Sequence, residues 1–189
     1  MLCCVTALTA FQELAASSSR KDIYMRRQEK ISDCKQHLQN INGFLTTYAK
    51  NNQGKYPADN NFAGLKNLLK LGLSHTVFYC ENYRGKKTKK LEDLNEETNP
   101  YLYFGGFDSK TVEKCPAVVL VCSKPNSRHC LVLMGDGNVL DLKKQLPDTK
   151  ITSAADIVEA LNKVYKYPAD VLNTLRIKAR MMDKKSQKK

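Results

Sequence analysis

The stretch that decides the fold runs from Ile31 to Leu69 and reads ISDCKQHLQNINGFLTTYAKNNQGKYPADNNFAGLKNLL. Its first apolar side chains recur three or four residues apart, which places them on one face of a helix. These side chains are Ile31, Cys34, Leu38, Ile41, Leu45 and Tyr48. Asn51 to Gly54 favour an end to this helix, and Pro57 prevents its continuation because proline lacks an amide donor. A helix with one apolar face needs a covering layer, which the downstream chain is expected to supply.

Short apolar runs separated by turn residues follow this helix, and they predict strands. We expect a helix from about Asp22 to Lys50, with a break before it at Ser17–Ser19. The later elements are expected as a helix at Phe62–Lys70, strands at Val77–Cys80, Tyr101–Phe104, Ala117–Cys122, Cys130–Met134 and Asn138–Leu142, and helices at Ala154–Val164 and after Pro168. Gly135-Asp136-Gly137 predicts a hairpin, and Ser153 with Asp156 predicts a capping box. This order predicts an α+β fold.

Four segments are expected along the chain. Residues 1–21 form a short apolar N-terminal segment, either a degenerate anchor or an amphipathic helix, because the run is shorter than the ~20 apolar residues of a membrane span. Residues 22–142 form a helix-plus-sheet domain, residues 143–175 a helical extension, and residues 176–189 a basic tail.

The net charge of +12 is concentrated in two segments. Residues 84–90 contain five basic side chains and no acid, and residues 176–189 have a net charge of +6. The rest of the chain is therefore near neutral, and no ordered basic face is evident. Such segments are usually solvated, and the alternative is electrostatic attachment to nucleic acid or anionic lipid. The expected contact residues are Arg84, Lys86, Lys87, Lys89, Lys90, Lys184, Lys185, Lys188 and Lys189.

The seven cysteines form no Cys-x-x-Cys pair, which argues against a zinc ribbon or a thioredoxin-type site. Cys122 and Cys130 lie in apolar strands and are expected in the core. Cys34, on the helix stripe, and Cys80, at the end of an expected strand, are candidates for a disulfide between helix and sheet. That bond would need an oxidising compartment.

Catalytic residues are not evident in the sequence. His129 and Cys130 are neighbours in an expected strand, so their side chains point to opposite faces and cannot act as a pair. No other acid, base and nucleophile converge, and Asp136 is explained as a turn residue because Asp-Gly tolerates positive φ. We therefore expect a protein that is not an enzyme and has no cofactor.

Four motifs, in order, resemble those of type II secretion pseudopilins and type IV pilin-like proteins, especially the major-pseudopilin group and its relatives with a prepilin-type, processing-associated His…Asp-Gly domain. They are Cys34-Lys35-Gln36-His37-Leu38 with Tyr48-Ala49-Lys50-Asn51-Asn52, Tyr56-Pro57 followed by Gly64-Leu65 and Leu68, Asn99-Pro100-Tyr101-Leu102-Tyr103, and His129 followed by Met134-Gly135-Asp136-Gly137-Asn138-Val139. The resemblance covers roughly Ile31 to Leu142. The prepilin cleavage motif with its long apolar helix is absent from the sequence.

The resemblance implies a pilin-like fold, a long helix packed on a small antiparallel sheet, and a non-enzymatic role in secretion or surface assembly. It implies other pilin-like or secretion-system subunits as partners, and a periplasmic, cell-surface or membrane-associated location. A cytoplasmic location is expected instead if Met1 is the true start and no anchor exists. Because some major pseudopilins bind calcium, the resemblance also implies Asp108 and Asp136 as calcium ligands.

The alternative function is a basic adaptor. It would hold nucleic acid or an anionic membrane through residues 84–90 and the C-terminal tail, with nucleic acid the less favoured of the two. Binding of this kind falls steeply with salt.

Overall fold

A computed structural model describes the backbone of residues 3–187 and the side chains of residues 22–184. Six α-helices, one 3-10 helix and one four-stranded antiparallel sheet make up the described part, which confirms the α+β class. The chain divides into two units, Met1–Asp33 and Cys34–Lys189. The sheet and all helices after the first belong to the second unit.

The first helix, α1, is longer than expected and extends over 49 residues, Cys3–Asn51. It passes without interruption through Ser17–Ser19, so the predicted break is wrong. The expected stripe is buried from Cys34 to Leu45 within the second unit, where Leu38, Ile41 and Leu45 are inaccessible to solvent, whereas Tyr48 is half-buried. The helix ends where Gln53 and Gly54 take positive φ and the Gly54 amide donates to the Ala49 carbonyl.

The second helix, α2 (Asn61–Leu69), confirms the expected short helix. Gly72 has φ +96°, and the Leu73 amide donates to the Leu68 carbonyl, which is the bonding of a Schellman cap. The strand expected at Val77–Cys80 is wrong, because His75–Phe78 forms a 3-10 helix, η1, capped by the Ser74 side chain. A short apolar run does not distinguish a strand from one helical turn, and this run has no neighbouring strand to pair with.

The sheet contains β1 (Tyr101–Tyr103), β2 (Val119–Ser123), β3 (Leu131–Met134) and β4 (Val139–Asp141), in that spatial order. All neighbours are antiparallel, and β2 is an interior strand with every residue buried, as expected. The hairpin between β3 and β4 is also confirmed, since Gly137 has φ +84° and the Met134 amide donates to the Asn138 carbonyl.

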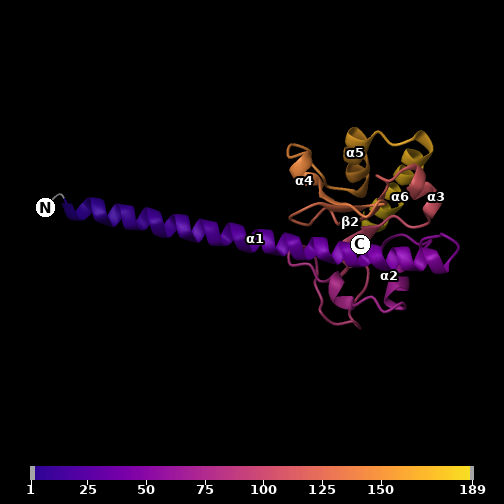
Figure 1. Ribbon diagram of the computed structural model, residues 1–189, viewed down its shortest axis with the longest axis horizontal. Helices are drawn as coiled ribbons and strands as arrows, with labels where there is room; N and C mark the ends of the chain where they lie inside the picture. The colour runs from indigo at the N-terminus through magenta and orange to yellow at the C-terminus, as the bar shows by residue number, and fades with distance from the viewer. Residues whose placement is uncertain (1–2, 188–189) are drawn as a thin grey trace. The chain divides into compact units, whose positions relative to one another are not determined.

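The two faces of the sheet pack against different helices. In Figure 1, β2 lies between the C-terminal part of α1 and α5. Tyr101 and Tyr103 of β1 are fully buried. Burial raises the pKa of Tyr103, and the charges of Tyr56 and of Tyr48 on α1 raise it further. Burial raises the pKa of Cys122 in β2, and the charges of Cys130 and of Asp183 on α6 raise it further.

Two short helices lie beside the strands and were not predicted. Asp108 caps α3 (Ser109–Lys114), and Asp141 caps α4 (Leu142–Gln145), so the expected final strand ends one residue early. Both begin at an aspartate whose side chain accepts a backbone amide hydrogen bond.

The C-terminal helices α5 (Ala154–Tyr165) and α6 (Ala169–Gln187) confirm the two expected helices, and α5 has the expected capping box. Val164 and Ile177 are apolar residues of these helices that are 41% and 60% exposed. The expected boundary between helix and basic tail at residue 176 falls inside α6. The tail is therefore partly structural: Arg176 forms a two-hydrogen-bond pair with Glu159, and Asp183 accepts from the first amides of α5.

None of the helices in the described part of the chain combines the length and the apolar composition that crossing a membrane requires. The short apolar N-terminal segment, residues 1–21, lies outside the residues whose side chains are described.

Candidate functional site

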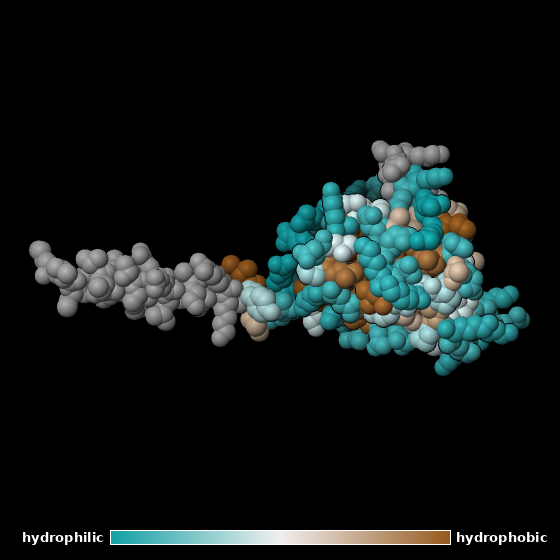
Figure 2. Space-filling view, turned by 90° about the horizontal axis from the view of Figure 1, so that it is seen from above, coloured by the Kyte–Doolittle hydropathy of each residue, from teal (hydrophilic) through white to brown (hydrophobic). Residues whose placement is uncertain are grey.

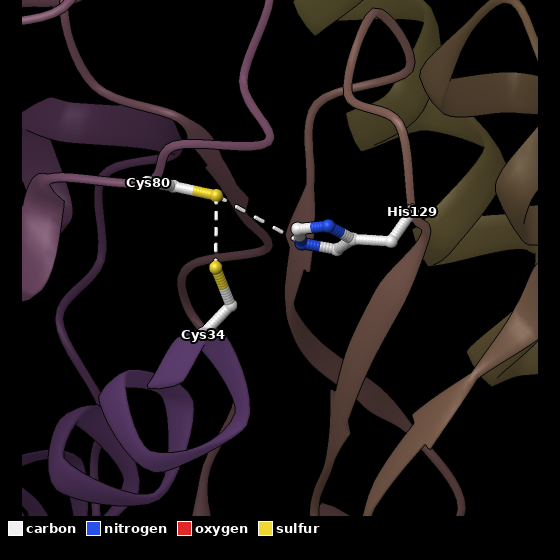
Figure 3. Close-up of side chains that lie close together, drawn as sticks. All are labelled: Cys34, Cys80 and His129. Atoms are coloured by element: carbon white, nitrogen blue, oxygen red, sulfur yellow. Dashed lines mark hydrogen bonds between the residues drawn. The ribbon is translucent and has the colours of Figure 1, made fainter. Parts of the chain in front are cut away.

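The candidate site brings together Cys34, Cys80 and His129, three side chains that are remote in the sequence. Cys34 is on α1, Cys80 follows η1, and His129 precedes β3. Figure 3 shows the two sulfur atoms and the imidazole ring pointing toward one another. All three side chains are buried, with exposed fractions of 2%, 3% and 3%.

The distances at the site are those of direct polar contact. The Cys34 and Cys80 Sγ atoms are 2.9 Å apart as a thiol hydrogen bond, and no disulfide joins them. The Cys80 Sγ lies 3.9 Å from Nε2 of His129. One ligand atom from each residue lies within 4.8 Å of both others, and no other group of three His, Cys, Asp or Glu side chains does so in the described residues.

Local structure holds each member of the site in place. Cys34 lies on the buried stripe of α1, four residues before Leu38, so the helix directs its thiol inward. The loops that carry Cys80 and His129 are joined by an antiparallel bridge between Tyr83 and Ser127. In addition, the Arg128 amide donates to the Asn82 carbonyl, over 2.9 Å.

The electrostatics of the site favour a thiolate. The hydrogen bond with Cys34 is the largest influence and lowers the pKa of the Cys80 thiol. Burial opposes this change, whereas the hydrogen bond and the charge of His129 support it, and the resulting pKa is about 5. Cys80 is therefore a buried thiol whose neighbours stabilise its charged form.

Two buried polar atoms beside the cluster have no hydrogen-bond partner. They are the hydroxyl of Tyr101, which is fully buried in β1, and Nδ1 of His129. Burial raises the pKa of the Tyr101 hydroxyl well above its ordinary value, and the charges of Cys34 and Cys80 raise it further. Because buried polar groups normally have partners, these atoms mark a place where a ligand could complete the bonding.

The structure brings together Cys34 and Cys80, the predicted disulfide candidates, but the inclusion of His129 was missed. The sequence analysis compared His129 only with its neighbour Cys130, whereas Cys80 lies 49 residues earlier. No spacing rule connects residues that far apart, so only the fold reveals this contact. Whether the two thiols oxidise to a disulfide stays a prediction.

Asp108 and Asp136, the predicted calcium ligands, are each engaged in their own turn. The Thr111 amide and hydroxyl donate to Oδ1 of Asp108, while the Asn138 amide and side chain donate to the carboxylate of Asp136. Neither carboxylate belongs to a group of three potential ligands in the described residues. The structure therefore adds no support to calcium binding, which stays a prediction.

The predicted basic contacts of residues 84–90 lie in an irregular, solvent-exposed loop, and Lys184 is also exposed. Two of these side chains contact their surroundings: Lys87 donates to the Glu81 carbonyl, and Lys89 lies over the ring of Tyr79 at 4.6 Å. Lys185, Lys188 and Lys189 lie outside the residues whose side chains are described. The basic side chains of this loop are therefore exposed to solvent, where a partner could reach them.

No family model, curated protein or solved structure matches the chain. What the site can do is therefore inferred from the chemistry of its side chains. Two thiols and an imidazole could bind a metal ion, or the thiols could form a disulfide.

Proposed function

We propose that the chain is a pilin-like subunit that acts through protein contacts in type II secretion or in pilus-like surface assembly, without catalytic activity of its own. The observation that carries the proposal is the long helix α1, whose stripe from Cys34 to Ala49 is buried in a unit with a four-stranded antiparallel sheet. This combination is what the resemblance of the sequence to pilin-like proteins implies.

Exposed apolar side chains on α1 give this proposal a contact surface. Ile23, Tyr24 and Met25 are 65%, 60% and 52% exposed. Three neighbouring large apolar residues are costly to leave in water, and such surfaces commonly bind other proteins. The proposed partners are other pilin-like or secretion-system subunits, and the proposed location is outside the cytoplasm or at the membrane.

A photo-crosslinking experiment tests the proposal. A photoreactive phenylalanine analogue replaces Tyr24 in the full chain, which is expressed in its native cell and irradiated, and the crosslinked partner is identified by mass spectrometry. We expect a pilin-like or secretion-system subunit, or a second copy of this chain. The matched control places the analogue at Lys163, an exposed position of α5. Equal crosslinking at both positions, or crosslinks only to cytoplasmic proteins, would contradict the proposal.

The second candidate function is the basic adaptor, and the exposure of the basic loop favours it. Residues 84–90 carry five basic side chains, all exposed, and Figure 2 shows hydrophilic residues over much of the surface in view. Deletion of residues 176–189 would be a poor test, because Ala179 and Met182 of that segment are buried. Charge reversal at Lys86 and Lys90 leaves the core intact.

The adaptor predicts that the purified chain binds vesicles containing an anionic lipid, and that affinity falls steeply between about 50 and 200 mM salt because several ionic contacts release counterions. Lys86→Glu with Lys90→Glu should weaken this binding, and Lys163→Glu should change it less. Binding that is insensitive to salt would exclude the adaptor and leave the pilin-like proposal standing.

A further inference from the structure

We propose that Cys34, Cys80 and His129 bind one thiophilic divalent cation, of which Zn²⁺ is the best match. The proposal concerns a site within the second unit and is independent of the assembly role. It rests on the meeting of three metal-binding side chains from three separate elements, as Figure 3 shows.

The ligand chemistry is specific. Zinc in proteins is bound by cysteine thiolates and histidine nitrogens, and two cysteines with one histidine occur where a fourth position remains for water or another ligand. Calcium and magnesium prefer oxygen, which this cluster lacks among its three members. Two sulfur ligands and one nitrogen ligand therefore favour an ion softer than calcium or magnesium.

The geometry is close to that of a tetrahedral site. With Zn–S bonds of about 2.3 Å and a Zn–N bond of about 2.0 Å, ligand atoms lie roughly 3.5–3.8 Å apart. The Cys80 Sγ is 3.9 Å from Nε2 of His129, and all three ligand atoms lie within 4.8 Å of one another. The two sulfur atoms, at 2.9 Å, would separate by less than about 1 Å on binding.

Charge balance also fits a divalent cation. Binding displaces any remaining thiol protons, so two thiolates neutralise the charge of the ion, and the filled site has no net charge. A neutral assembly suits three side chains that are at most 3% exposed, because an isolated charge at such a position would lose its hydration without compensation.

His129 distinguishes a metal site from a simple disulfide. A disulfide would use only the two sulfur atoms, whereas metal binding uses the imidazole that is buried against Cys80. The Tyr101 hydroxyl has no hydrogen-bond partner, and its pKa is raised by burial and then by the charges of Cys34 and Cys80, so an unsatisfied oxygen is available near the two thiols. A bound ion would join α1, the segment after η1 and the start of β3, three parts of the fold that are distant in sequence.

Cobalt titration of the full chain tests the proposal. The protein is reduced with a phosphine, freed of metal with a chelator and titrated anaerobically with Co²⁺, whose tetrahedral thiolate complexes absorb in the visible and near ultraviolet. We expect one equivalent per chain, displaced by Zn²⁺. Loss of one direct ligand in Cys80→Ser or His129→Gln should weaken binding at least about 100-fold, because even outer-shell changes cost 10–100-fold.

Cys115→Ser is the matched control, since Cys115 is buried but outside the cluster, and this variant should bind like the wild type. A measurement on the unaltered protein covers the case in which a variant fails to fold. Zn²⁺ should protect Cys34 and Cys80 from alkylation, as mapped by mass spectrometry, more than it protects Cys115.

Three results would overturn the proposal. They are the absence of stoichiometric binding by the reduced wild type, a tetrahedral cobalt spectrum that His129→Gln retains at full strength, and equal protection of all the cysteines. Recovery of the chain from its cell with a Cys34–Cys80 disulfide and no metal would also overturn it.

Discussion

Two pairs of cysteines in this protein are equally buried and have opposite chemistry. Cys34 and Cys80 meet at the cluster, while Cys122 lies in β2 and Cys130 directly precedes β3, and all four are at most 3% exposed. Burial raises the pKa of Cys130 to about 12 and that of Cys122 well above its ordinary value. The pKa of Cys80 is instead lowered to about 5.

The difference lies in the neighbours rather than in the burial. Cys122 is enclosed by apolar strand residues, so nothing compensates the loss of water around a thiolate. Cys80 has the Cys34 thiol and the imidazole of His129 within reach, and these outweigh its burial. Exposure alone therefore does not identify a reactive or metal-binding cysteine; its polar partners do.

The largest expected effect is on the pH dependence of stability in chelator-treated, reduced protein. The folded pKa of Cys80, about 5, lies below its ordinary value of 9.0, so the native state favours the thiolate. This contribution is fully present above about pH 9 and is lost as the pH falls through about 5. We expect the free energy of unfolding by urea to rise between pH 5 and pH 9.

Two variants test whether His129 contributes to this rise in the free energy of unfolding. His129→Asn removes the imidazole, so the rise should be smaller, because less would then hold down the pKa of Cys80. In Cys115→Ser the free energy of unfolding should rise between pH 5 and pH 9 as it does in the wild type. A wild-type curve without a rise between pH 5 and pH 9 would mean that the two pairs of cysteines do not differ as described.

The next effect compares hydroxyl substitutions at the two pairs. In Cys122→Ser a hydroxyl enters a fully buried apolar strand, and an unpaired buried hydroxyl costs about 1–3 kcal/mol. In Cys80→Ser the hydroxyl remains beside the Cys34 thiol, 2.9 Å from the Cys80 sulfur in the wild type, and a hydrogen bond there limits the cost to below about 1 kcal/mol. Urea unfolding near pH 5, where the thiolate contribution is lost, measures the free energy of unfolding of both variants. A larger loss in Cys80→Ser than in Cys122→Ser would refute the comparison.

The sequence predicts much of this fold because local signals and global packing agree. The stripe on α1, the Gly137 turn and the capping box at Ser153 each have a residue pattern that permits few alternatives. The misread segment at Val77–Cys80 is a four-residue run, too short for its period to be measured. The pilin-like arrangement stays a prediction, since it depends on more than element order.

The sequence indicated two of the three members of the cluster, Cys34 and Cys80. The stripe showed that Cys34 points inward, and the position of Cys80 after an apolar run suggested a partner across the core. His129 gave no such signal, because its contact depends on the bridge between Tyr83 and Ser127, two loop residues without a strand pattern. Long-range loop pairing of this kind is set by the folded chain rather than by local periodicity.

A smaller effect extends the comparison to two tyrosines of β1. Tyr103 belongs to the sheet core, and its hydroxyl donates to the Pro57 carbonyl at 3.0 Å. Tyr103→Phe removes this bond and leaves a carbonyl in buried surroundings without that donor, so we expect a loss of about 1 kcal/mol in the free energy of unfolding. Thermal and urea unfolding of the variant measure it, and an unchanged stability would contradict the assigned bond.

The smallest expected effect, with the opposite sign, is at Tyr101, two residues earlier on the same strand. Its hydroxyl is buried beside Cys34 and Cys80 without a hydrogen-bond partner. Removing an unsatisfied buried group is nearly neutral or stabilising, so Tyr101→Phe should change the metal-free stability by between zero and about +0.5 kcal/mol. If the same variant also binds Co²⁺ less tightly than the wild type, the hydroxyl belongs to the site. Destabilisation of the metal-free protein by 1 kcal/mol or more would instead show that the hydroxyl has a partner, because only a group with a bond to lose carries that cost.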